Sequence, residues 1–363
     1  MKEIRTVDAE GQVLCHDVTQ IIKGVTKDAV FRKGHVIRKE DIPVLLSVGK
    51  DHIYVWEKDE DMLHENEAAE ILYSLCENRH MHPSEVKEGK IEVIADCSGL
   101  LKVDRRRLNL VNGLGEMMIA SRHGNFPVKA GDKIAGTRII PLVIEKEKME
   151  RAREVCEGTP LFELKPYLHR KAGIVTTGNE VYHGRIRDTF TPVIEEKLAE
   201  YDVEIIGHEV SDDDHERITA CIRRLLEAGA DLILCTGGMS VDPDDRTPLA
   251  IRNTGAEIVT YGAPVLPGAM FLLAYLDGEI AEGEYGAEEE KSREGGHGRA
   301  VIMGLPGCVM YAKRTIFDLV LPRIMAGERL SGKDIFVLGE GGLCLSCPVC
   351  TFPNCGFGKG GGA

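Results

Sequence analysis

Residues 231–248 read Asp-Leu-Ile-Leu-Cys-Thr-Gly-Gly-Met-Ser-Val-Asp-Pro-Asp-Asp-Arg-Thr-Pro. The apolar run at the start is typical of a strand buried on both faces of a parallel sheet. A glycine pair, Gly237-Gly238, follows the strand and opens a loop with three aspartates. Thr247-Pro248 then indicates a helix start, because proline is tolerated in the first helical turn. This strand, loop and helix predict an α/β fold with a ligand site in the loop.

The surrounding sequence repeats this alternation of strands and helices. We predict strands at 172–175, 203–210, 231–236 and 256–261, helices at 191–201, 218–229 and from 247, a hairpin from 271–276 to 300–303, and a long helix at 309–325. Strands that alternate with helices form βαβ units in a parallel sheet. Residues 166–330 are therefore expected to form a three-layer α/β/α domain with a mostly parallel sheet.

The first 165 residues have a different pattern. Residues 1–57 are predicted to form a small α+β module with a short helix at 44–48 and a strand at 53–56. Residues 58–165 are predicted to form a helix through Cys76, a β-rich region, and a further helix at 145–156. The basic run Arg105–Arg107 is interpreted as a solvated turn or edge rather than a nucleic-acid patch, given the negative net charge. Residues 277–299 carry eight acidic and three basic residues, which predicts a mobile loop.

Charge and composition restrict the ligands and partners. The formal net charge of -14 argues against non-specific nucleic-acid binding, which needs a basic surface. No apolar run approaches the roughly 20 residues of a membrane-spanning helix, and the N-terminus does not resemble a signal peptide. We therefore expect a cytoplasmic protein. An anionic ligand must be held by backbone N–H groups, single basic residues or a bridging cation.

In a parallel α/β sheet, ligands bind at the carboxyl ends of the strands, which selects four loops. The first loop supplies the Thr177 hydroxyl, a close backbone approach at Gly178 and the Glu180 carboxylate, although alone it reads as an ordinary turn. The second contains Asp212, Asp213 and Asp214. One aspartate suffices for helix capping, and three like charges repel one another, so this loop favours a cation site.

The third and fourth loops offer anion sites. Backbone N–H groups at Gly237 and Gly238 can point at an anion, and Ser240 adds a donor. Asp244 or Asp245 can hold Mg²⁺ between phosphate oxygens. The fourth loop, with Pro306 and Gly307, precedes the predicted long helix, and is either a second anion site or an ordinary strand-to-helix turn.

The C-terminal residues 331–363 form a Cys-rich tail. Its thiols, Cys344, Cys347, Cys350 and Cys355, have spacings of two, two and four residues. Thiolates at such spacing suit Zn²⁺ or an iron–sulfur cluster. The alternative is a disordered tail with reducible thiols; the metal site is the favoured prediction.

These loops, in this order, resemble the molybdopterin-binding domain shared by molybdopterin adenylyltransferases and molybdopterin molybdenumtransferases, the MogA/MoeA superfamily that includes gephyrin. The matching stretches are 177–181, Gly184 with Asp188, Asp212-Asp213, 236–248 and 305–307. The resemblance implies that the Gly237-Gly238 loop cradles the phosphate of a pyranopterin. It also implies that Asp245 and Asp212 handle metal or molybdate, with Glu180 and Asp188 nearby.

Two functions follow from this resemblance. In the first, the chain is a molybdopterin molybdenumtransferase of molybdenum cofactor biosynthesis, which inserts molybdate into adenylated molybdopterin and releases AMP with Mg²⁺. In the second, it is a non-catalytic carrier or sensor of molybdopterin for a client molybdoenzyme. The second hypothesis rests on departures from the family, because no Asp-Gly-Tyr-Ala motif is present and the Cys-rich tail replaces a β-domain. Self-association is implied by the resemblance alone.

Overall fold

The computed structural model describes residues 2–22, 26–55, 60–277 and 299–360. Within these ranges the chain forms two compact units. Unit 1 comprises residues 1–97, 102–122 and 128–164, and unit 2 comprises residues 98–101, 123–127 and 165–363. The acidic loop predicted at 277–299 lies almost entirely outside the described residues. No helix in the described ranges is long and apolar enough to cross a membrane.

Unit 1 begins with a small module that has its own core. The module contains β1 (Lys2–Arg5), η1 (Thr6–Asp8), β2 (Val18–Ile22), β3 (Thr26–Phe31), α1 (Asp41–Ser47) and β4 (His52–Val55). The apolar core lies between α1 and the antiparallel pair β1 and β4, and includes Leu14, Leu45 and Ile53. Gly49 follows Val48, the C-cap of α1, and has a φ of +77°, as expected for a glycine that ends a helix.

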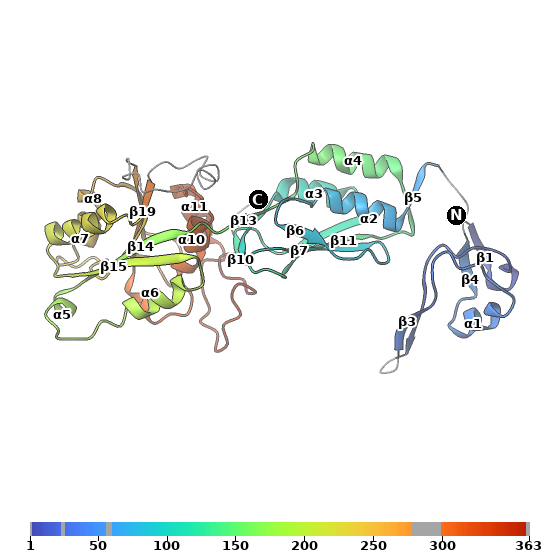
Figure 1. Ribbon diagram of the computed structural model, residues 1–363, viewed down its shortest axis with the longest axis horizontal. Coiled ribbons are helices and arrows are strands. Elements are labelled where there is room, and N and C mark those ends of the chain that lie inside the picture. The colour runs from blue at the N-terminus through green and yellow to red at the C-terminus, as the bar shows by residue number, and fades with distance from the viewer. Residues whose placement is uncertain (1, 23–25, 56–59, 278–298, 361–363) are drawn as a thin grey trace. The chain divides into compact units, whose positions relative to one another are not determined.

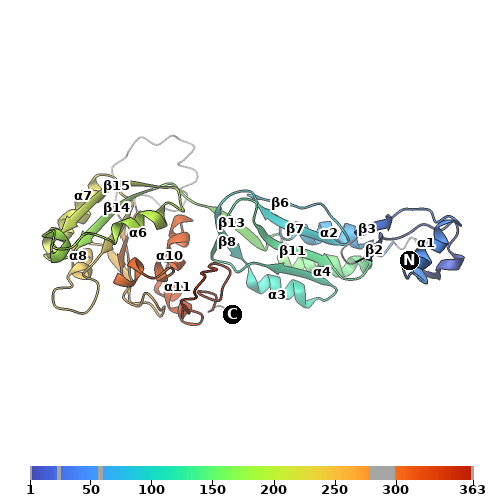
Figure 2. The same cartoon turned by 90° about the horizontal axis from the view of Figure 1, so that it is seen from below.

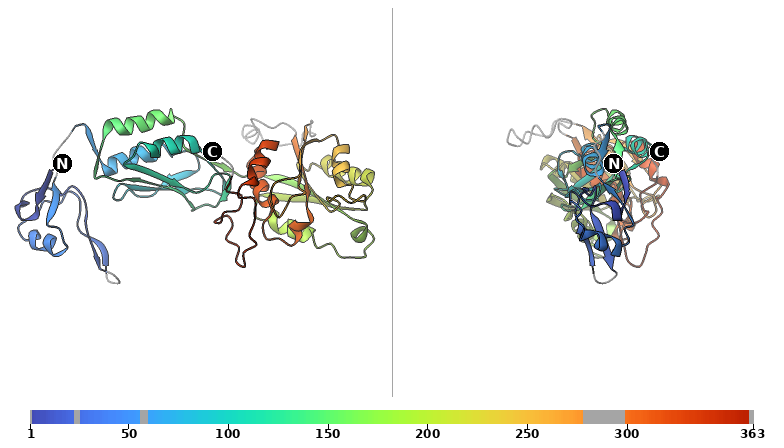
Figure 3. Two further views of the ribbon diagram at one scale, coloured as in Figure 1. Left: turned by 180° about the vertical axis from the view of Figure 1, so that it is seen from behind. Right: turned by 90° about the vertical axis from the view of Figure 1, so that its right-hand side faces the viewer.

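The rest of the N-terminal half, through β13, combines helices with antiparallel sheets. Its elements are β5 (Met62–His64), α2 (Glu65–Ser74), β6 (Met81–Pro83), β7 (Lys90–Ala95), β8 (Gly99–Val103), α3 (Arg105–Gly113), β9 (Met117–Ser121), β10 (Phe126–Val128), β11 (Lys133–Ile139), β12 (Val143–Glu145), α4 (Lys146–Cys156) and β13 (Phe162–Pro166). The largest sheet has the order β6-β7-β11-β9. Figure 3 shows α2, α3 and α4 on one face of this sheet.

The interpretation of Arg105–Arg107 as a solvated turn or edge is wrong. These residues form the first turn of α3, because the side chain of Asp104 accepts the Arg107 N–H at 2.9 Å and caps the helix. Val111 is the buried residue of α3. The basic run therefore lies on a capped helix with a narrow apolar face.

Unit 2 is built on a six-stranded sheet of order β15-β14-β16-β19-β18-β17. The elements of the unit from residue 170 on are β14 (Arg170–Thr177), α5 (Asn179–Tyr182), α6 (Thr191–Leu198), β15 (Val203–Ser211), α7 (His215–Glu227), β16 (Leu232–Thr236), α8 (Thr247–Asn253), β17 (Glu257–Tyr261), β18 (Leu272–Asp277), β19 (Arg299–Leu305), η3 (Gly307–Met310), α10 (Ile316–Met325), α11 (Gly332–Phe336) and η4 (Val337–Gly339). β15, β14, β16 and β19 are parallel, whereas β17, β18 and β19 pair antiparallel.

Helices cover both faces of this sheet, which confirms the predicted three-layer arrangement (Figures 1 and 2). One core packs α7 and α8 against alternate strand residues such as Val175, Ile233 and Ile302. The other packs α6 and α10 against the intervening residues, among them Ile174 and Leu234. This alternation follows from the two-residue period of a strand.

The start predicted for the long helix at 309–325 is wrong. A 3-10 helix at 307–310 and a turn precede α10, which begins at Ile316. Thr315 and Asp318 form a capping box, in which the Thr315 N–H donates to Asp318 at 2.7 Å. A helix start is fixed where its N–H groups find such acceptors.

Asp318 also joins α10 to α6 through a buried ion pair. Its carboxylate lies 2.7 Å from Lys197 Nζ and 2.9 Å from Arg314 Nη1, and its side chain is 4% exposed. Asp318→Ala should lower the free energy of unfolding of unit 2 by about 3–5 kcal/mol, because it leaves a buried ammonium without its anionic partner. Urea denaturation, with hydrogen exchange of α6 and α10 as the local readout, measures this loss.

The matched control is Asp202→Ala, which removes an exposed carboxylate 3.2 Å from His169 Nδ1. An exposed pair contributes at most about 1 kcal/mol, so this variant should unfold close to the wild type. Equal losses in the two variants would show that burial of the Asp318 pair has no energetic consequence.

Candidate functional site at the carboxyl edge of the sheet

The carboxyl ends of β14, β15, β16 and β19 meet at one edge of the sheet in unit 2 (Figure 1). In the parallel register Thr176 lies beside Thr236, Thr177 beside Ser211, and Thr236 beside Leu305. The four loops selected from the sequence therefore begin side by side, as the parallel topology requires.

The glycine pair after β16 is packed directly against the end of β14. Gly237 has a φ of +84° and Gly238 a φ of +55°, a backbone region that favours glycine. A Cβ at Gly237 would lie 2.2 Å from the Thr177 carbonyl oxygen, and one at Gly238 would lie 2.7 Å from Thr247 Oγ1. Conformation and space therefore both restrict these positions to glycine.

Two buried hydroxyl groups fix the ends of this loop. Thr177 Oγ1 donates to the Thr236 carbonyl at 3.1 Å and lies 3.1 Å from Thr247 Oγ1. Thr247 Oγ1 donates in turn to the Gly237 carbonyl at 2.9 Å. Thr177, which the sequence suggested as a ligand donor, is thus engaged inside the loop and shapes its backbone.

Polar contacts hold the outer part of the loop. The Asp245 carboxylate accepts the Ser240 N–H at 3.0 Å. The Tyr261 hydroxyl lies within hydrogen-bond distance of two backbone carbonyls of the loop. It can donate to the Met239 carbonyl at 3.0 Å or to the Ser240 carbonyl at 3.3 Å. Asp245 and Ser240, which the sequence selected separately, therefore act on one turn of backbone.

The three aspartates after β15 have three different roles. Asp214 caps α7, accepting the N–H groups of Glu216 and Arg217 at 2.9 and 3.0 Å. Asp212 pairs with Arg217 Nη1 at 2.6 Å. Asp213 accepts the Asn179 N–H at 3.0 Å, on the loop after β14. The sequence pointed to Asp212, but Asp213 is the residue that contacts the neighbouring site loop.

Asp213 lies among other carboxylates. Burial raises its pKa, and the negative charges of Glu180, Asp244 and Asp245 raise it further, against the lowering effect of the Asn179 hydrogen bond. Four carboxylates from three loops are therefore within electrostatic reach of one another. Such a group suits a cation.

A second polar group lies at the same sheet edge beside α6. Thr176 Oγ1 is 2.9 Å from His208 Nε2 and 3.1 Å from Thr191 Oγ1, and Thr191 Oγ1 donates to Asp188 at 2.6 Å. Burial alone would raise the pKa of Asp188, but hydrogen bonds from Thr191 and Phe190 and the nearby His208 lower it overall. Sequence analysis selected Asp188 but missed His208. The only feature of the sequence that could have indicated His208 is a single histidine within the predicted strand at 203–210.

Gly178, Pro306 and Gly307, which the sequence analysis also selected, lie at the same edge of the sheet. Gly178 has a φ of +137° and donates its N–H to the Ser211 carbonyl at 3.2 Å. Pro306 precedes the four-residue 3-10 helix Gly307–Met310. Since the predicted long helix does not begin here, the Pro306-Gly307 turn lacks the helix N-terminus that the anion hypothesis used.

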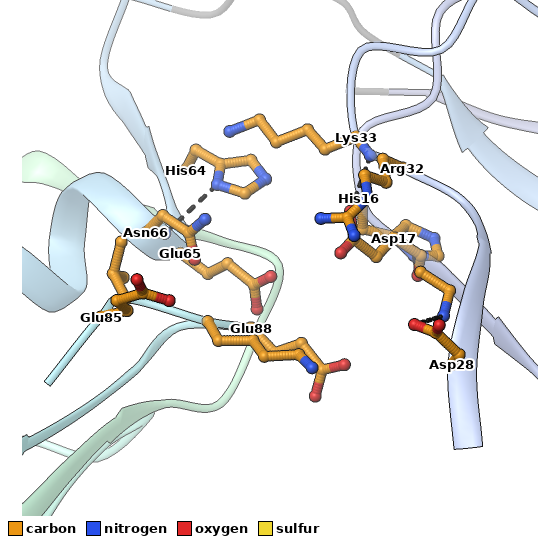
Figure 4. A pocket seen from close by; sticks show the side chains of 13 residues that line it. His16, Asp17, Asp28, Arg32, Lys33, His64, Glu65, Asn66, Glu85 and Glu88 are labelled. Carbon is orange, nitrogen blue, oxygen red and sulfur yellow. Dashed lines mark hydrogen bonds between the residues drawn. The ribbon is translucent and has the colours of Figure 1, made fainter. Parts of the chain in front are cut away.

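Unit 1 has a polar pocket of about 270 Å³ that the sequence analysis did not select (Figure 4). Its lining includes His16, Asp17, Lys33, His64 and Glu65. His64 Nε2 lies 2.8 Å from the Cys15 carbonyl, and burial lowers the pKa of His64. Charges of both signs line the pocket, so its chemistry does not favour one class of ligand.

Metal-ligating side chains do not converge in the part of the chain that the structure describes: no three His, Cys, Asp or Glu side chains form a group that could hold an ion. In the tail, Cys344 and Cys355 are half-buried, whereas Cys347 and Cys350 are exposed. Neither the carboxylates at the sheet edge nor the thiols of the tail therefore form a complete ion site from protein side chains alone within the described ranges.

Gly237→Ala tests the close approach of the glycine loop. A non-glycine residue in left-handed backbone conformation costs roughly 1–2 kcal/mol of stability. We expect Gly237→Ala to lower the free energy of unfolding by more than this, because the added methyl group would also clash with the Thr177 carbonyl oxygen. Gly255→Ala is the control, since Gly255 has a φ of +94° with nothing within 4 Å of an added Cβ. Denaturation of both variants measures the difference, and equal losses would contradict the packing argument.

Asp213→Asn tests the carboxylate group by its pH dependence. The pKa of Asp213 is raised in the folded chain. Ionisation of Asp213 therefore destabilises the folded chain above that pKa. At low pH the carboxyl is protonated in both the folded and the unfolded chain, so this destabilisation is absent. The variant should therefore be more stable than the wild type at pH 7, and the difference should disappear at about pH 3, where the carboxyl is protonated in both states.

Asp214→Asn provides a control of opposite sign. Hydrogen bonds from the α7 backbone lower the pKa of Asp214, so its ionised form stabilises the fold above the unfolded-state pKa and this contribution disappears as the pH falls. This variant should lose stability at pH 7. A loss in both variants at pH 7 would contradict the assignment of Asp213 to a repulsive group.

Known families match two parts of the chain. Residues 173–326 match the family described as "Probable molybdopterin binding domain", and residues 3–57 match one described as "Domain of unknown function (DUF8806)". A CinA-like protein of Mycobacterium avium (strain 104) is 39% identical over 90 residues, which are 24% of this chain and 21% of that protein. A CinA-like protein of a Mycobacterium tuberculosis strain matches to the same extent. The chain thus spans about a fifth of the length of these relatives.

Among solved structures, the molybdopterin biosynthesis enzyme MoaB from Thermus thermophilus is 23% identical, with a TM-score of 0.32, over 44% of this chain and 98% of that one. The tungsten cofactor synthesizing protein MoaB from Pyrococcus furiosus is 18% identical, with a TM-score of 0.30, over 39% of this chain and 84% of that one. The family match coincides with the sheet and the site loops described above. The chain therefore contains, over residues 173–326, a domain of the molybdopterin-binding family.

Proposed function

We propose that unit 2 binds molybdopterin, or its adenylated form, at the carboxyl edge of its sheet, and inserts molybdate with release of AMP. The observation that carries this proposal is the loop from Gly237 to Thr247. Its first two residues must be glycine, and carboxylates from three loops lie beside it. Backbone donors next to carboxylates suit a phosphate that is bound together with a cation.

The acidic residues require Mg²⁺ for this ligand. Glu180, Asp213, Asp244 and Asp245 would repel a phosphate, and their oxygen atoms are the ligand type that Mg²⁺ prefers. Since no three such side chains already form an ion site in the described residues, the phosphate oxygens would complete the coordination. When bound, the ion would neutralise charge on the pyrophosphate.

Each residue of the site has a proposed role. Gly237 and Gly238 shape the phosphate loop, and Ser240 is held at its rim by Asp245. Asp245 and Asp213 are the proposed carboxylates of the reaction, with Asp213 in place of Asp212 because Asp212 is paired with Arg217. Thr177 and Gly178 position the loop, while Glu180, Asp188, Pro306 and Gly307 are proposed to line the ligand.

A non-catalytic role is the second candidate. The chain spans about a fifth of its CinA-like relatives, so it need not share their activity. In this role unit 2 carries or senses molybdopterin for a client molybdoenzyme, in the cytoplasm and as a homo-oligomer. Zinc or an iron–sulfur cluster on the four tail cysteines remains a prediction from their spacing, and metal analysis of protein purified without oxygen tests it.

Asp245→Asn separates the two candidates. The substitution keeps an oxygen that can accept the Ser240 N–H but removes the charge, so the loop should stay folded while AMP release falls by at least about 100-fold. Molybdate-dependent AMP release from adenylated molybdopterin measures activity, and fluorescence of the oxidised pterin measures binding. Pterin binding without any AMP release in the wild type would leave only the carrier role.

Asp212→Asn and Asp213→Asn form the matched pair for the second carboxylate. We expect Asp213→Asn to lower AMP release and Asp212→Asn to leave it within about threefold of the wild type, because Asp212 is neutralised by Arg217. The reverse order would restore the assignment made from the sequence. If the wild-type protein has no pterin affinity, both candidate functions fail.

A further inference from the structure

The tail from Gly341 to Gly360, here called the thiol loop, is closed at its base. The Gly358 N–H donates to the Gly341 carbonyl at 2.9 Å. A Cβ at Gly341 would lie 2.6 Å from the Gly360 nitrogen, and one at Gly360 would lie 1.9 Å from the Glu340 carbonyl oxygen. Glycines therefore let the two ends of the loop meet backbone to backbone.

Aromatic residues anchor the thiol loop to unit 2. Phe357 is buried in the core beside α10, and the Phe352 ring lies 6.2 Å from the Phe357 ring and 5.8 Å from that of Phe126. At the start of the loop, the Cys344 N–H donates to the Leu266 carbonyl at 2.8 Å. The loop thus has protein anchors at both ends.

These anchors divide the four thiols into two classes. Cys344 and Cys355 pack against the core of unit 2, close to the anchor points. Cys347 and Cys350 are exposed, and the intervening stretch contains Val349 with 76% of its surface exposed. The sequence between the exposed pair is Cys347-Pro348-Val349-Cys350, a two-residue spacing typical of redox dithiols.

Two basic residues contact the thiol loop. Lys313 Nζ donates to the Pro348 carbonyl at 3.0 Å. The Arg314 guanidinium lies 5.0 Å from the centre of the Phe352 ring. Burial acts to lower the pKa of Arg314, but Asp318, Glu200 and the Cys350 thiol raise it overall. The positive charge of Arg314 is thus within electrostatic reach of Cys350.

We propose that Cys347 and Cys350 are a redox-active dithiol that reduces a disulfide substrate. The Cys350 thiolate attacks one sulfur of the substrate, and the first substrate thiolate leaves. The Cys347 thiolate then attacks Cys350 in the mixed disulfide and expels the second substrate thiolate. Two protein thiols become one disulfide, while two electrons and the two thiol protons pass to the substrate, which becomes two thiols.

Glutathione disulfide is the probe for this dithiol. The reduced full-length chain is equilibrated without oxygen in mixtures of reduced and oxidised glutathione, alkylated and mapped by mass spectrometry. We expect a reversible Cys347–Cys350 disulfide, and alkylation of this reduced pair at least about tenfold faster than that of Cys344 and Cys355. Cys347→Ser should accumulate a mixed disulfide of Cys350 with glutathione, since the resolving thiol is absent.

Cys97→Ser and Cys308→Ser are the matched controls, because both remove half-buried thiols outside the thiol loop. They should leave the Cys347–Cys350 disulfide unchanged. The proposal fails if the disulfide maps to another pair or does not form. It also fails if the purified chain holds zinc or iron that protects all four thiols until a chelator is added. Pterin affinity measured on the same sample is independent of each of these outcomes.

Discussion

The contact between Gly237 and the Thr177 carbonyl is the constraint on which the site depends. Because a side chain cannot enter there, the chain leaves β16 against the end of β14 and reaches Thr247 within eleven residues. Thr247 bonds back to Gly237 and begins α8, so one short loop joins strand, site and helix. This turn keeps the loop that carries Asp244 and Asp245 at the carboxyl edge of the sheet.

The acidic chain concentrates repulsion at the carboxyl edge of the sheet in unit 2. Asp212 and Asp214 are neutralised by Arg217 and by the α7 N-terminus, whereas Asp213 faces other carboxylates and has a raised pKa. A fold without a ligand would gain stability by removing that charge. Its presence at the edge of the sheet is the pattern expected where stability is sacrificed for binding.

The sequence predicted the sheet of unit 2, whereas the side-chain contacts at the edge of that sheet could not be predicted from local patterns. Apolar strands and proline at helix starts are local signals, so β14 to β19 were found close to their bounds. The start of α10 was missed, although the capping box of Thr315 and Asp318 that fixes it is a local pattern. Which of Asp212 and Asp213 contacts the loop after β14 depends on the direction of each side chain, which the sequence does not contain. His208 contacts Thr176 across two strands, a relation that no local pattern contains.

The tail shows the same limit on a larger scale. The spacing of the four cysteines allows their thiols to come together, and this spacing by itself predicts a metal site. Between Cys350 and Cys355, however, Phe352 must bury its ring, and the next turns must bring Phe357 into the core. These apolar anchors direct Cys355 inward, whereas Cys350 remains exposed. Burial of aromatic surface, rather than the ligand pattern, thus decides which thiols are half-buried and which are exposed.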